Sequence, residues 1–352
     1  MNLLEQIINR GIQKNTSDIH LGVGFVPALR LDGRVVFENE LKPITPGQIE
    51  ECLKRLLTDD ERARLQQGCE IDTAFSYSKD ARFRVHAYQE RGGINIALRY
   101  LPDSRPTLES LGMFSEYERL FEKLLCEPYG LLLVTGPTGA GKSTTLAAMI
   151  DYINTHKTDH VITIEDPIEY LHTSKQSLIK QREVGEGKDS ASFPQALRAA
   201  LREDPDVILV GEMRDRATIS LAITAAETGH LVLSTLHTNT TYQAVNRIVD
   251  VFPPDQQGQI RSQLSQNLAG IIAQRLIPKK QGGRAIALEI LINTNAIKTQ
   301  IRDNKLQTIQ STMQTSKAEG MILLKDYIAR LVAEGLIDEE VGARFLLSQA
   351  AY

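Results

Sequence analysis

The sequence predicts an α/β protein, with an α+β N-terminal domain and a larger nucleotide-binding domain built on a mostly parallel sheet. Its length of 352 residues is enough for two domains that each bury a core. A short apolar run ends abruptly in a glycine-rich loop at residues 136–143, which is the pattern of a strand followed by a phosphate-binding turn. Beyond that loop, apolar runs alternate with helical patterns, as they do in helix-flanked parallel sheets.

Composition and charge exclude several classes of protein. Apolar residues make up 42% and charged residues 24% of the chain, and these average values exclude disordered and fibrous proteins. A net charge of −4 gives no electrostatic footprint for nucleic acid, so we expect no nucleic-acid partner. No apolar run is as long as a membrane span, and the first residues lack a signal peptide's apolar core. We therefore expect no direct membrane insertion, and membrane association only through a partner.

The cysteines indicate a reducing compartment. Cys52, Cys69 and Cys126 are scattered and form no C-x-x-C motif. They support neither a disulfide framework nor a tetracysteine zinc site. A cytoplasmic location fits this pattern best.

The first part of the N-terminal domain is predicted from a change of periodicity. Apolar residues recur at helical spacing in residues 2–14, and Thr45-Pro46 opens a second helix that continues in the same style over residues 59–65. Between these helices the pattern favours strands at Thr16–Leu21, Pro27–Leu31 and Arg34–Glu38, with Asp32-Gly33 as a tight turn.

The last two strands of this domain carry arginines on one face. Residues 82–89 and 94–101 alternate strongly, which places Arg82, Arg84 and His86 on the face opposite the apolar residues. Two interpretations are open for that face. It is either an ordinary solvated surface, or a basic edge that reaches a phosphate across a subunit interface.

The second domain follows a natural linker at Pro102–Pro106. Strands are predicted at Val161–Glu165, Val207–Val210 and Leu231–Leu236. Helices are predicted at Phe114–Cys126, Pro194–Arg202, Ala217–Thr228 and Gln256–Gln274. Residues 279–284 are expected to form a solvated hairpin loop, and the tail from Ala296 to be helical. A sheet of this kind binds its ligand at the carboxyl ends of its strands.

The motif that carries the chemistry follows the buried strand Leu131–Val134. The expected cofactor-binding residues are Gly136, Pro137, Thr138, Gly139, Ala140, Gly141, Lys142, Ser143 and Thr144, which include a full G-x-x-x-x-G-K-[ST] motif. Glycines let the loop's amides turn toward a polyanion, and the following helix adds the positive end of its dipole. We expect Lys142 over the β- and γ-phosphates of ATP, and Ser143 on Mg²⁺. A turn that binds nothing is the alternative, which the order of strand, motif and helix disfavours.

Two strands end in acids of the kind that phosphoryl transfer requires. Glu212 comes just after Val207–Val210, in the position of a Walker B carboxylate, and Glu165 begins a cluster that includes Asp166 and Glu169. Carboxylates there can hold Mg²⁺ and orient an attacking water. Acids beyond a strand also serve as turn residues and helix caps. The nearby phosphate loop favours the catalytic interpretation.

Two histidines bracket a predicted strand and complete the set of candidates. His230 precedes Leu231–Leu236 and His237 follows it. Both could sense or polarise a phosphate, although we expect a structural hydrogen bond for at least one. Their spacing matches no common zinc site, and no cysteine accompanies them.

Taken together, these segments resemble the secretion ATPases of the type IV pilus and type II secretion superfamily. The segments are GPTGAGKSTTLAAMI, ITIEDPIEY, QREVG, DPDVILVGEMRD, AETGHLVLSTLHTN and NRIVDVFPP. SDIHL, LDGRV and RFRVHAYQERGGINIALRYLP are similar to the N-terminal domain of the PilT/PilU family of pilus retraction ATPases. One segment departs from that family, because Ala296-Ile297-Lys298-Thr299-Gln300-Ile301 replaces its AIRNLI motif.

The resemblance implies a fold and an assembly. It implies a PAS-like N-terminal domain at residues 1–101, a linker at 102–112, and a RecA-like P-loop ATPase domain at 113–352 with a helical C-terminal tail. The implied assembly is a homo-hexamer that holds ATP and Mg²⁺ between the ATPase domain of one subunit and the N-terminal domain of the next. Its implied partners are an inner-membrane pilus platform protein and a second retraction ATPase, which place it in the cytoplasm at the inner membrane.

The resemblance also implies roles for residues. Arg82, Arg84 and Arg99 become candidates to neutralise phosphate charge at the subunit interface. Glu165 would orient or deprotonate the water and Glu212 would hold the Mg²⁺ shell, or the two roles are reversed.

The implied activity is a Mg²⁺-dependent ATPase that drives pilus retraction and twitching motility. Two alternatives are open: a pilus-extension or secretion ATPase, and an accessory ring component like PilU with little activity of its own. The replacement at residues 296–301 bears on that choice, because Lys is not equivalent to Arg at a bidentate site.

Overall fold

The structure is a computed structural model that describes residues 2–31, 33–78, 81–102 and 106–350. The chain divides into two compact units, residues 1–104 and 105–352. Part of the predicted linker, residues 103–105, lies outside the described residues, as does Asp32 of the predicted turn. Within the rest of the linker, Pro102 ends a strand and Glu109–Leu111 form a short 3-10 helix, η1. Among the described residues, no helix is both long and apolar enough to cross a membrane.

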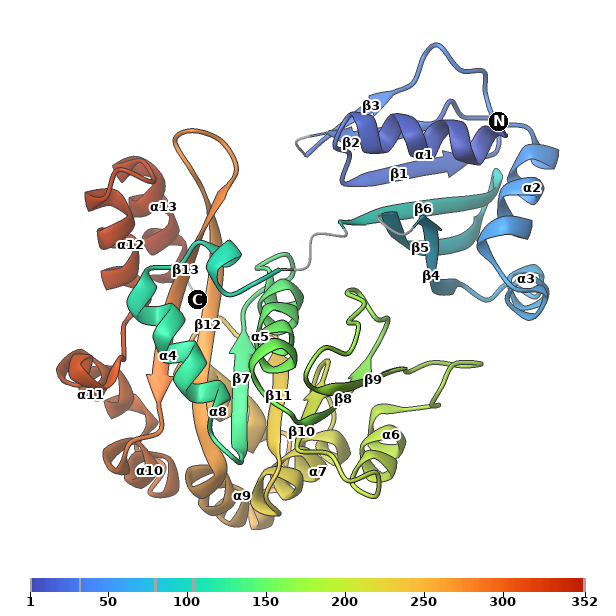
Figure 1. The fold of residues 1–352 in the computed structure, drawn as a ribbon. Helices are drawn as coiled ribbons and strands as arrows, with labels where there is room; N and C mark the ends of the chain where they lie inside the picture. The colour runs from blue at the N-terminus through green and yellow to red at the C-terminus, as the bar shows by residue number, and fades with distance from the viewer. Residues whose placement is uncertain (1, 32, 79–80, 103–105, 351–352) are drawn as a thin grey trace. The chain divides into compact units, whose positions relative to one another are not determined.

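The first unit is an antiparallel sheet with helices on one face (Figure 1). Its elements are α1 (Leu3–Gln13), β1 (Asp18–Gly22), β2 (Ala28–Leu31), β3 (Arg34–Phe37), α2 (Pro46–Leu56), α3 (Asp59–Gln66), β4 (Ile71–Ser78), β5 (Ala81–Glu90) and β6 (Gly93–Pro102). The strand order is β3-β2-β1-β6-β5-β4. The sequence pattern located every one of these elements except β4.

Local signals set the starts of the helices in this unit. At the start of α2 the Thr45 hydroxyl accepts a hydrogen bond from the Gln48 amide, and the Gln48 side chain accepts one from the Thr45 amide. Pro46 is the first helical residue. The apolar faces of α1 and α2 pack on the inward side of β5, where Phe83 and Val85 are fully buried. The outward side of β5 therefore carries its polar residues, as the alternation predicts.

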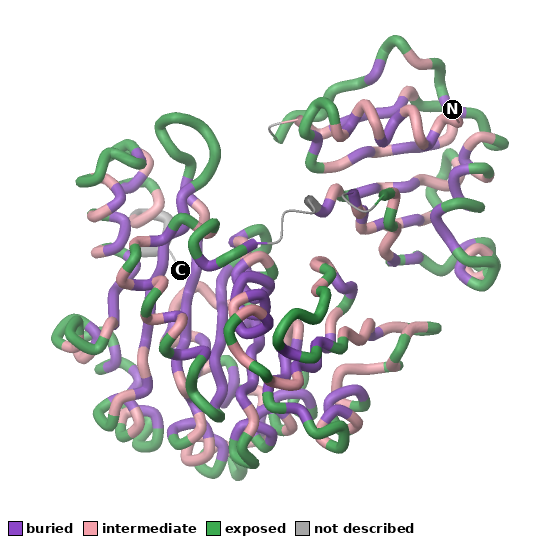
Figure 2. Tube along the Cα trace, viewed as in Figure 1, coloured by how far each residue is buried: buried purple, intermediate pink, exposed green. Residues whose placement is uncertain are grey.

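The second unit is a seven-stranded sheet with helices on both faces. Its strands are β7 (Gly130–Thr135), β8 (His160–Glu165), β9 (Leu178–Glu183), β10 (Val207–Val210), β11 (Leu231–Leu236), β12 (Leu268–Pro278) and β13 (Arg284–Ile292). The order is β13-β12-β7-β11-β10-β8-β9, and all neighbours are parallel except β12 and β13. Figure 2 shows that the central strands are buried along their length.

The helices complete two cores, one on each side of this sheet. They are α4 (Ser115–Leu125), α5 (Lys142–His156), α6 (Phe193–Ala200), α7 (Arg216–Glu227), α8 (Thr241–Asp250), α9 (Pro254–Asn267), α10 (Asn295–Arg302), α11 (Ile309–Thr315), α12 (Leu324–Ala333) and α13 (Glu339–Ala350). Helices α4, α5 and α12 pack on one face, and α6 to α11 on the other. The tail is helical, as predicted, and the loop at 279–284 joins the antiparallel pair β12 and β13.

One predicted helix is wrong over its last turns. The helix predicted at Gln256–Gln274 ends at Asn267, and β12 begins at Leu268. Helical spacing continues into the strand, because Ile260, Leu264 and Leu268 are buried four residues apart. The following run belongs to a strand because it lies between β7 and β13 and is buried on both faces.

Candidate nucleotide-binding site

The predicted phosphate loop joins β7 to α5, and its backbone suits an anion. Gly136, Gly139 and Gly141 have φ of 154°, 78° and 85°, which are values that favour glycine. Helix α5 begins at Lys142, and no side chain of the described residues caps its first turn. The amides of that turn and the positive end of the helix dipole are therefore available to a phosphate.

Lys142 is buried within the loop. Its ammonium donates to Gly136 O at 3.0 Å and to Pro137 O at 3.1 Å. Burial lowers the pKa of this ammonium, and the charges of Glu169 and Glu212 act in the opposite direction. The structure thus brings the cation of the motif and carboxylates from two other strand ends into one region, as the sequence predicts.

The residues around Lys142 divide into buried and exposed parts. Pro137, Thr138 and Gly139 form the exposed tip of the loop, while Ala140 is buried. Ser143 is exposed at the start of α5, where its hydroxyl is accessible to a bound ion.

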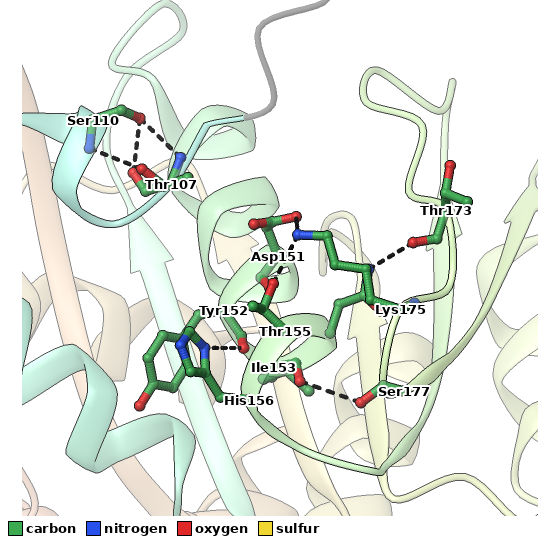
Figure 3. A network of polar contacts seen from close by, with 11 residues as sticks. Thr107, Ser110, Asp151, Tyr152, Ile153, Thr155, His156, Thr173, Lys175 and Ser177 are labelled. Atoms are coloured by element: carbon green, nitrogen blue, oxygen red, sulfur yellow. Dashed lines mark hydrogen bonds and ion pairs between the residues drawn. The ribbon is translucent and has the colours of Figure 1, made fainter.

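Helix α5 is also tied to the segment between β8 and β9 (Figure 3). Lys175 Nζ donates to Asp151 Oδ1 at 2.8 Å and to Thr155 Oγ1 at 2.7 Å. The Ser177 hydroxyl donates to the carbonyl of Ile153 at 3.2 Å. Nearer the loop, the hydroxyls of Thr144 and Tyr170 are 3.0 Å apart. These bonds hold the helix that follows the phosphate loop against the polypeptide that follows Glu165.

Glu165 ends β8 with an oriented carboxylate. Thr163 Oγ1 donates to Glu165 Oε1 at 2.7 Å, and Gln181 Nε2 donates to the same oxygen at 3.2 Å. Burial raises the pKa of Glu165 to about 7, against these two hydrogen bonds, which lower it. A backbone hydrogen bond from Glu169 also reaches this carboxylate and acts with them. A carboxyl with a pKa near neutral pH is suited to take a proton from water.

Glu212 and His237 come together at the ends of two adjacent strands. Glu212 follows β10 and His237 follows β11, and His237 Nε2 lies 3.6 Å from Glu212 Oε2. Arg214 Nε contacts the other carboxylate oxygen at 2.8 Å. Burial lowers the pKa of His237, with a further contribution from the charge of Lys142. Among the described residues, no group of three or more His, Cys, Asp or Glu side chains could hold a metal ion by itself.

The neighbouring strand β12 completes the wall behind the loop. Gln274 is 1% exposed, and its amide donates to Ala140 O at 2.6 Å and accepts from Thr145 Oγ1 at 2.7 Å. Arg275, 8% exposed, donates to Asn239 Oδ1 at 2.9 Å. Gln274 is the last residue of the helix that the sequence pattern predicted and Arg275 follows it, so the part of both residues in the site was missed. Polar residues inside an apolar run beside a phosphate loop are the signal that could have found them.

The family comparison agrees with this geometry. A family model described as "Type II/IV secretion system protein" matches residues 1–322. The chain belongs to this family.

Relatives within the type II/IV secretion family match nearly the whole chain. The type IV pilus retraction ATPase PilT of Pseudomonas aeruginosa is 45% identical over 96% of this chain and 96% of its own. The type IV pilus ATPase PilU of the same organism is 38% identical over 96% of this chain and 86% of its own. A crystal structure of the pilus retraction motor PilT with bound ADP superposes with a TM-score of 0.88, at 47% identity, over 97% of this chain and 96% of that one. This likeness supports a mixed α/β fold with an N-terminal domain and an ATPase domain.

The structure does not bring His230, one of the predicted site residues, to the phosphate loop. His230 precedes β11, so it lies at the strand's amino end, about 20 Å from the end that carries His237. Its Nδ1 donates to Ala225 O at 2.9 Å. This is the structural hydrogen bond expected for one of the two histidines, and within one chain the geometry gives His230 no contact with the loop.

The three predicted arginines lie on the first unit, and two of them contact acids of that unit. Arg84 and Arg99 are cross-strand partners on β5 and β6. Arg84 Nε lies 3.5 Å from Asp72, and Arg99 Nε lies 2.9 Å from Asp18. Arg82 shares the face of Arg84 and is partly buried. Within one chain, the predicted role at phosphate rests on the resemblance.

Proposed function

We propose that the chain is an ATP-hydrolysing motor that powers type IV pilus retraction and twitching motility. The observation that carries the proposal is the oriented carboxylate of Glu165 at the carboxyl end of the same parallel sheet as a phosphate loop whose helix is open to an anion. That pairing supplies a binding site and a proton acceptor, which are the two parts that hydrolysis requires. The relation to PilT, at 45% identity over 96% of both chains, supports retraction as the work performed.

The residues at the strand ends divide the work between binding and chemistry. Lys142 and the backbone N–H groups of residues 136–144, other than Pro137, which has none, bind the phosphates. Ser143 and Glu212 hold Mg²⁺, since this ion takes few protein ligands and keeps water and phosphate oxygens for the rest. When bound, Mg²⁺ neutralises charge that develops on the transferred phosphoryl group. Glu165 accepts the proton of the attacking water, and His237 holds Glu212 in place.

The proposal includes a ring. The subunits form a homo-hexamer in which the first unit, a PAS-like domain of residues 1–101, is joined by residues 102–112 to a RecA-like domain of residues 113–352. In that ring Arg82, Arg84 and Arg99 exchange their contacts within the chain for the phosphates bound by a neighbour. Hydrolysis then changes the angle between the domains around the linker.

The assembly works in the cytoplasm at the inner membrane, on a platform protein of the pilus machine. A second candidate, an accessory ring component like PilU, is favoured by one observation. On α10, Lys298 and Gln300 are partly exposed and Thr299 is exposed, so the changed motif alters a surface rather than the core.

A turnover assay on the purified chain tests the enzymatic part. We expect Mg²⁺-dependent ATP hydrolysis by the wild type, and its loss in Lys142→Ala and Glu212→Gln. Glu227→Gln, which changes an exposed acid at the end of α7, serves as the matched control. Equal turnover in all four proteins would contradict the proposed site.

Counting surface pili in a deletion strain tests the direction of the motor. More pili and lost twitching, rescued by the wild type but not by Glu212→Gln, are expected for retraction. Fewer pili would mean extension. Unchanged pili together with little turnover would favour the accessory role.

A further inference from the structure

Strand β12 contacts the phosphate loop through a buried glutamine. Gln274 donates through Nε2 to Ala140 O and accepts through Oε1 from Thr145 Oγ1. Ala140 belongs to the loop and Thr145 to the first turn of α5, so one amide joins both parts of the phosphate site. Both ends of this amide are satisfied, which fixes its orientation.

The backbone of β12 also limits the shape of the loop. A Cβ added to Gly136 would lie 2.6 Å from Gln274 O, and one added to Gly141 would lie 2.9 Å from Gln274 Nε2. The first and last glycines of the loop therefore pack directly on a single residue. The loop cannot shift toward β12, and it cannot shift away without breaking buried hydrogen bonds.

The next residue extends this contact to the segment that carries His237. Arg275 donates to Gln274 O at 2.9 Å, to Asn239 O at 3.1 Å and to Asn239 Oδ1 at 2.9 Å. The neighbouring Thr238 amide donates to Thr135 Oγ1 at 3.0 Å, just before the loop begins. The segment after β11 is thus hydrogen-bonded both to β7 and to β12.

Arg275 is moreover a buried cation without an acidic neighbour in contact. Its described hydrogen bonds all go to carbonyl oxygens, and no carboxylate of the described residues lies within ion-pair distance of it. Burial lowers the pKa of Arg275, and the charge of the buried Glu289 on β13 acts in the opposite direction, so Glu289 offsets part of the cost of burying this cation. The phosphate loop lies directly beside it, because Arg275 Nη1 is 3.5 Å from where a Gly136 Cβ would be.

We propose that Gln274 and Arg275 are two positioning residues, together called the β12 latch, that fix the phosphate loop and the His237 segment relative to each other. The buried cation of Arg275 also favours bound phosphate. The inference deepens the proposed function, because it rests on nucleotide binding at this loop. In this proposal Gln274 holds the loop in the conformation that binds phosphate. Arg275 adds positive charge behind the loop and positions His237 next to Glu212.

A purely structural role is the alternative, and it predicts different measurements. If these residues only stabilise the fold, their substitution lowers the melting temperature but leaves the nucleotide affinity of the folded protein unchanged. The latch predicts a change in nucleotide affinity and a split between KM and kcat. The two hypotheses are therefore separated by titrating a fluorescent ADP analogue into the full-length protein, well below its melting temperature.

Four substitutions test the latch. Gln274→Met keeps the volume but removes both hydrogen bonds, and we expect about tenfold weaker ADP binding or more. Arg275→Lys keeps the charge but loses the paired contact with Asn239, so kcat falls more than affinity. Arg275→Met also loses the charge, so we expect it to lower both kcat and the affinity for ADP. Thr145→Val removes the hydrogen bond that Thr145 donates to Gln274, and we expect it to weaken ADP binding less than Gln274→Met does. This variant keeps the test available if Gln274→Met folds poorly.

The controls separate failure of the latch from failure of the proposed function. Gln263→Met, on the surface of α9, matches Gln274→Met and is expected to bind ADP as the wild type does. Lys142→Ala is expected to abolish binding. If it does, while the Gln274 and Arg275 variants bind ADP within twofold of wild type and keep kcat, the latch alone is refuted. If Lys142→Ala binds ADP normally, the nucleotide site is wrong and the latch falls with it.

A double-mutant cycle measures the connection to the His237 segment directly. Asn239→Ala and Arg275→Lys each remove the same contact, so the latch predicts that combining them lowers kcat little beyond either change alone. Fully additive losses would refute the proposed connection through Asn239.

Discussion

Replacing Glu165 by glutamine is expected to abolish turnover and, at alkaline pH, to stabilise the protein. The carboxylate is held by Thr163 and Gln181 through Oε1, and a glutamine carbonyl accepts the same two hydrogen bonds. The substitution therefore keeps the size of the side chain and these two hydrogen bonds, and it removes the ability to carry charge. Since burial is the main cause of the raised pKa, the charged form is the one that the folded protein disfavours.

The magnitude follows from the pKa shift. The pKa rises from 4.5 to about 7 in the folded protein, and at about 1.4 kcal/mol per unit this corresponds to about 3 kcal/mol. Because the folded-state pKa is the higher one, the favourable contribution is full below pH 4.5 and is lost as the pH rises through about 7. Glutamine does not ionise, so Glu165→Gln gains about 3 kcal/mol over wild type at pH 8 and roughly half of that near pH 5.5.

Urea unfolding followed by circular dichroism measures this difference, a suitable method since the chain has no tryptophan. Glu227→Gln, at an exposed acid, is the matched control and is expected to show no pH-dependent gain. Wild-type turnover is expected to fall as the pH drops through about 7, because protonated Glu165 cannot accept a proton. A variant that is less stable than wild type at pH 8, or one that retains turnover, would refute the reasoning.

Two other predictions concern Gly136 and the cysteines. Gly136→Ala is expected to abolish ADP binding in a titration while the fold survives by circular dichroism, because its φ is 154° and its Cβ would lie 2.6 Å from Gln274 O; wild-type affinity would contradict the loop geometry. For the cysteines, a thiol reagent near pH 8 is expected to label exposed Cys69 and Cys126 in the native chain but not Cys52, which is buried and has its pKa raised to about 11 by burial. Mass spectrometry of the labelled chain checks this, and rapid labelling of Cys52 would show that α2 opens readily.

The fold was predicted best where strands are short and fully buried. β10 and β11 coincide with their predicted bounds, because an apolar run between polar residues has few other interpretations. β12 failed for the opposite reason. Its apolar residues continue the helical spacing of α9, and the outcome is decided by pairing with two other strands, of which β7 lies far away in the sequence.

The candidate site shows the same division between local and distant information. The phosphate loop is a contiguous motif, and Glu165 and Glu212 are recognisable because each directly follows an apolar run. By contrast, Gln181 and Gln274 contact the site from strands that pair with β8 and β7. A motif scan has no means of placing such residues, because their contacts depend on strand order.

These distant contacts bear on how binding could become mechanical work. The ammonium of Lys142 is bonded to the carbonyls of its own loop, so a bound phosphate must replace those bonds or share the donor. The loop cannot absorb that change alone, since it packs on Gln274 and joins Thr135, whose hydroxyl bonds Thr238. The segment after Thr238 in turn ends at Thr241, whose amide and hydroxyl donate to the buried Glu289 on β13. Hydrogen bonds therefore connect the phosphate loop, through the partly exposed segment 238–240, to the buried Glu289 on β13 at the edge of the sheet, where α12 packs. A motor requires such a connection between the phosphates and the rest of the domain, and a simple hydrolase does not.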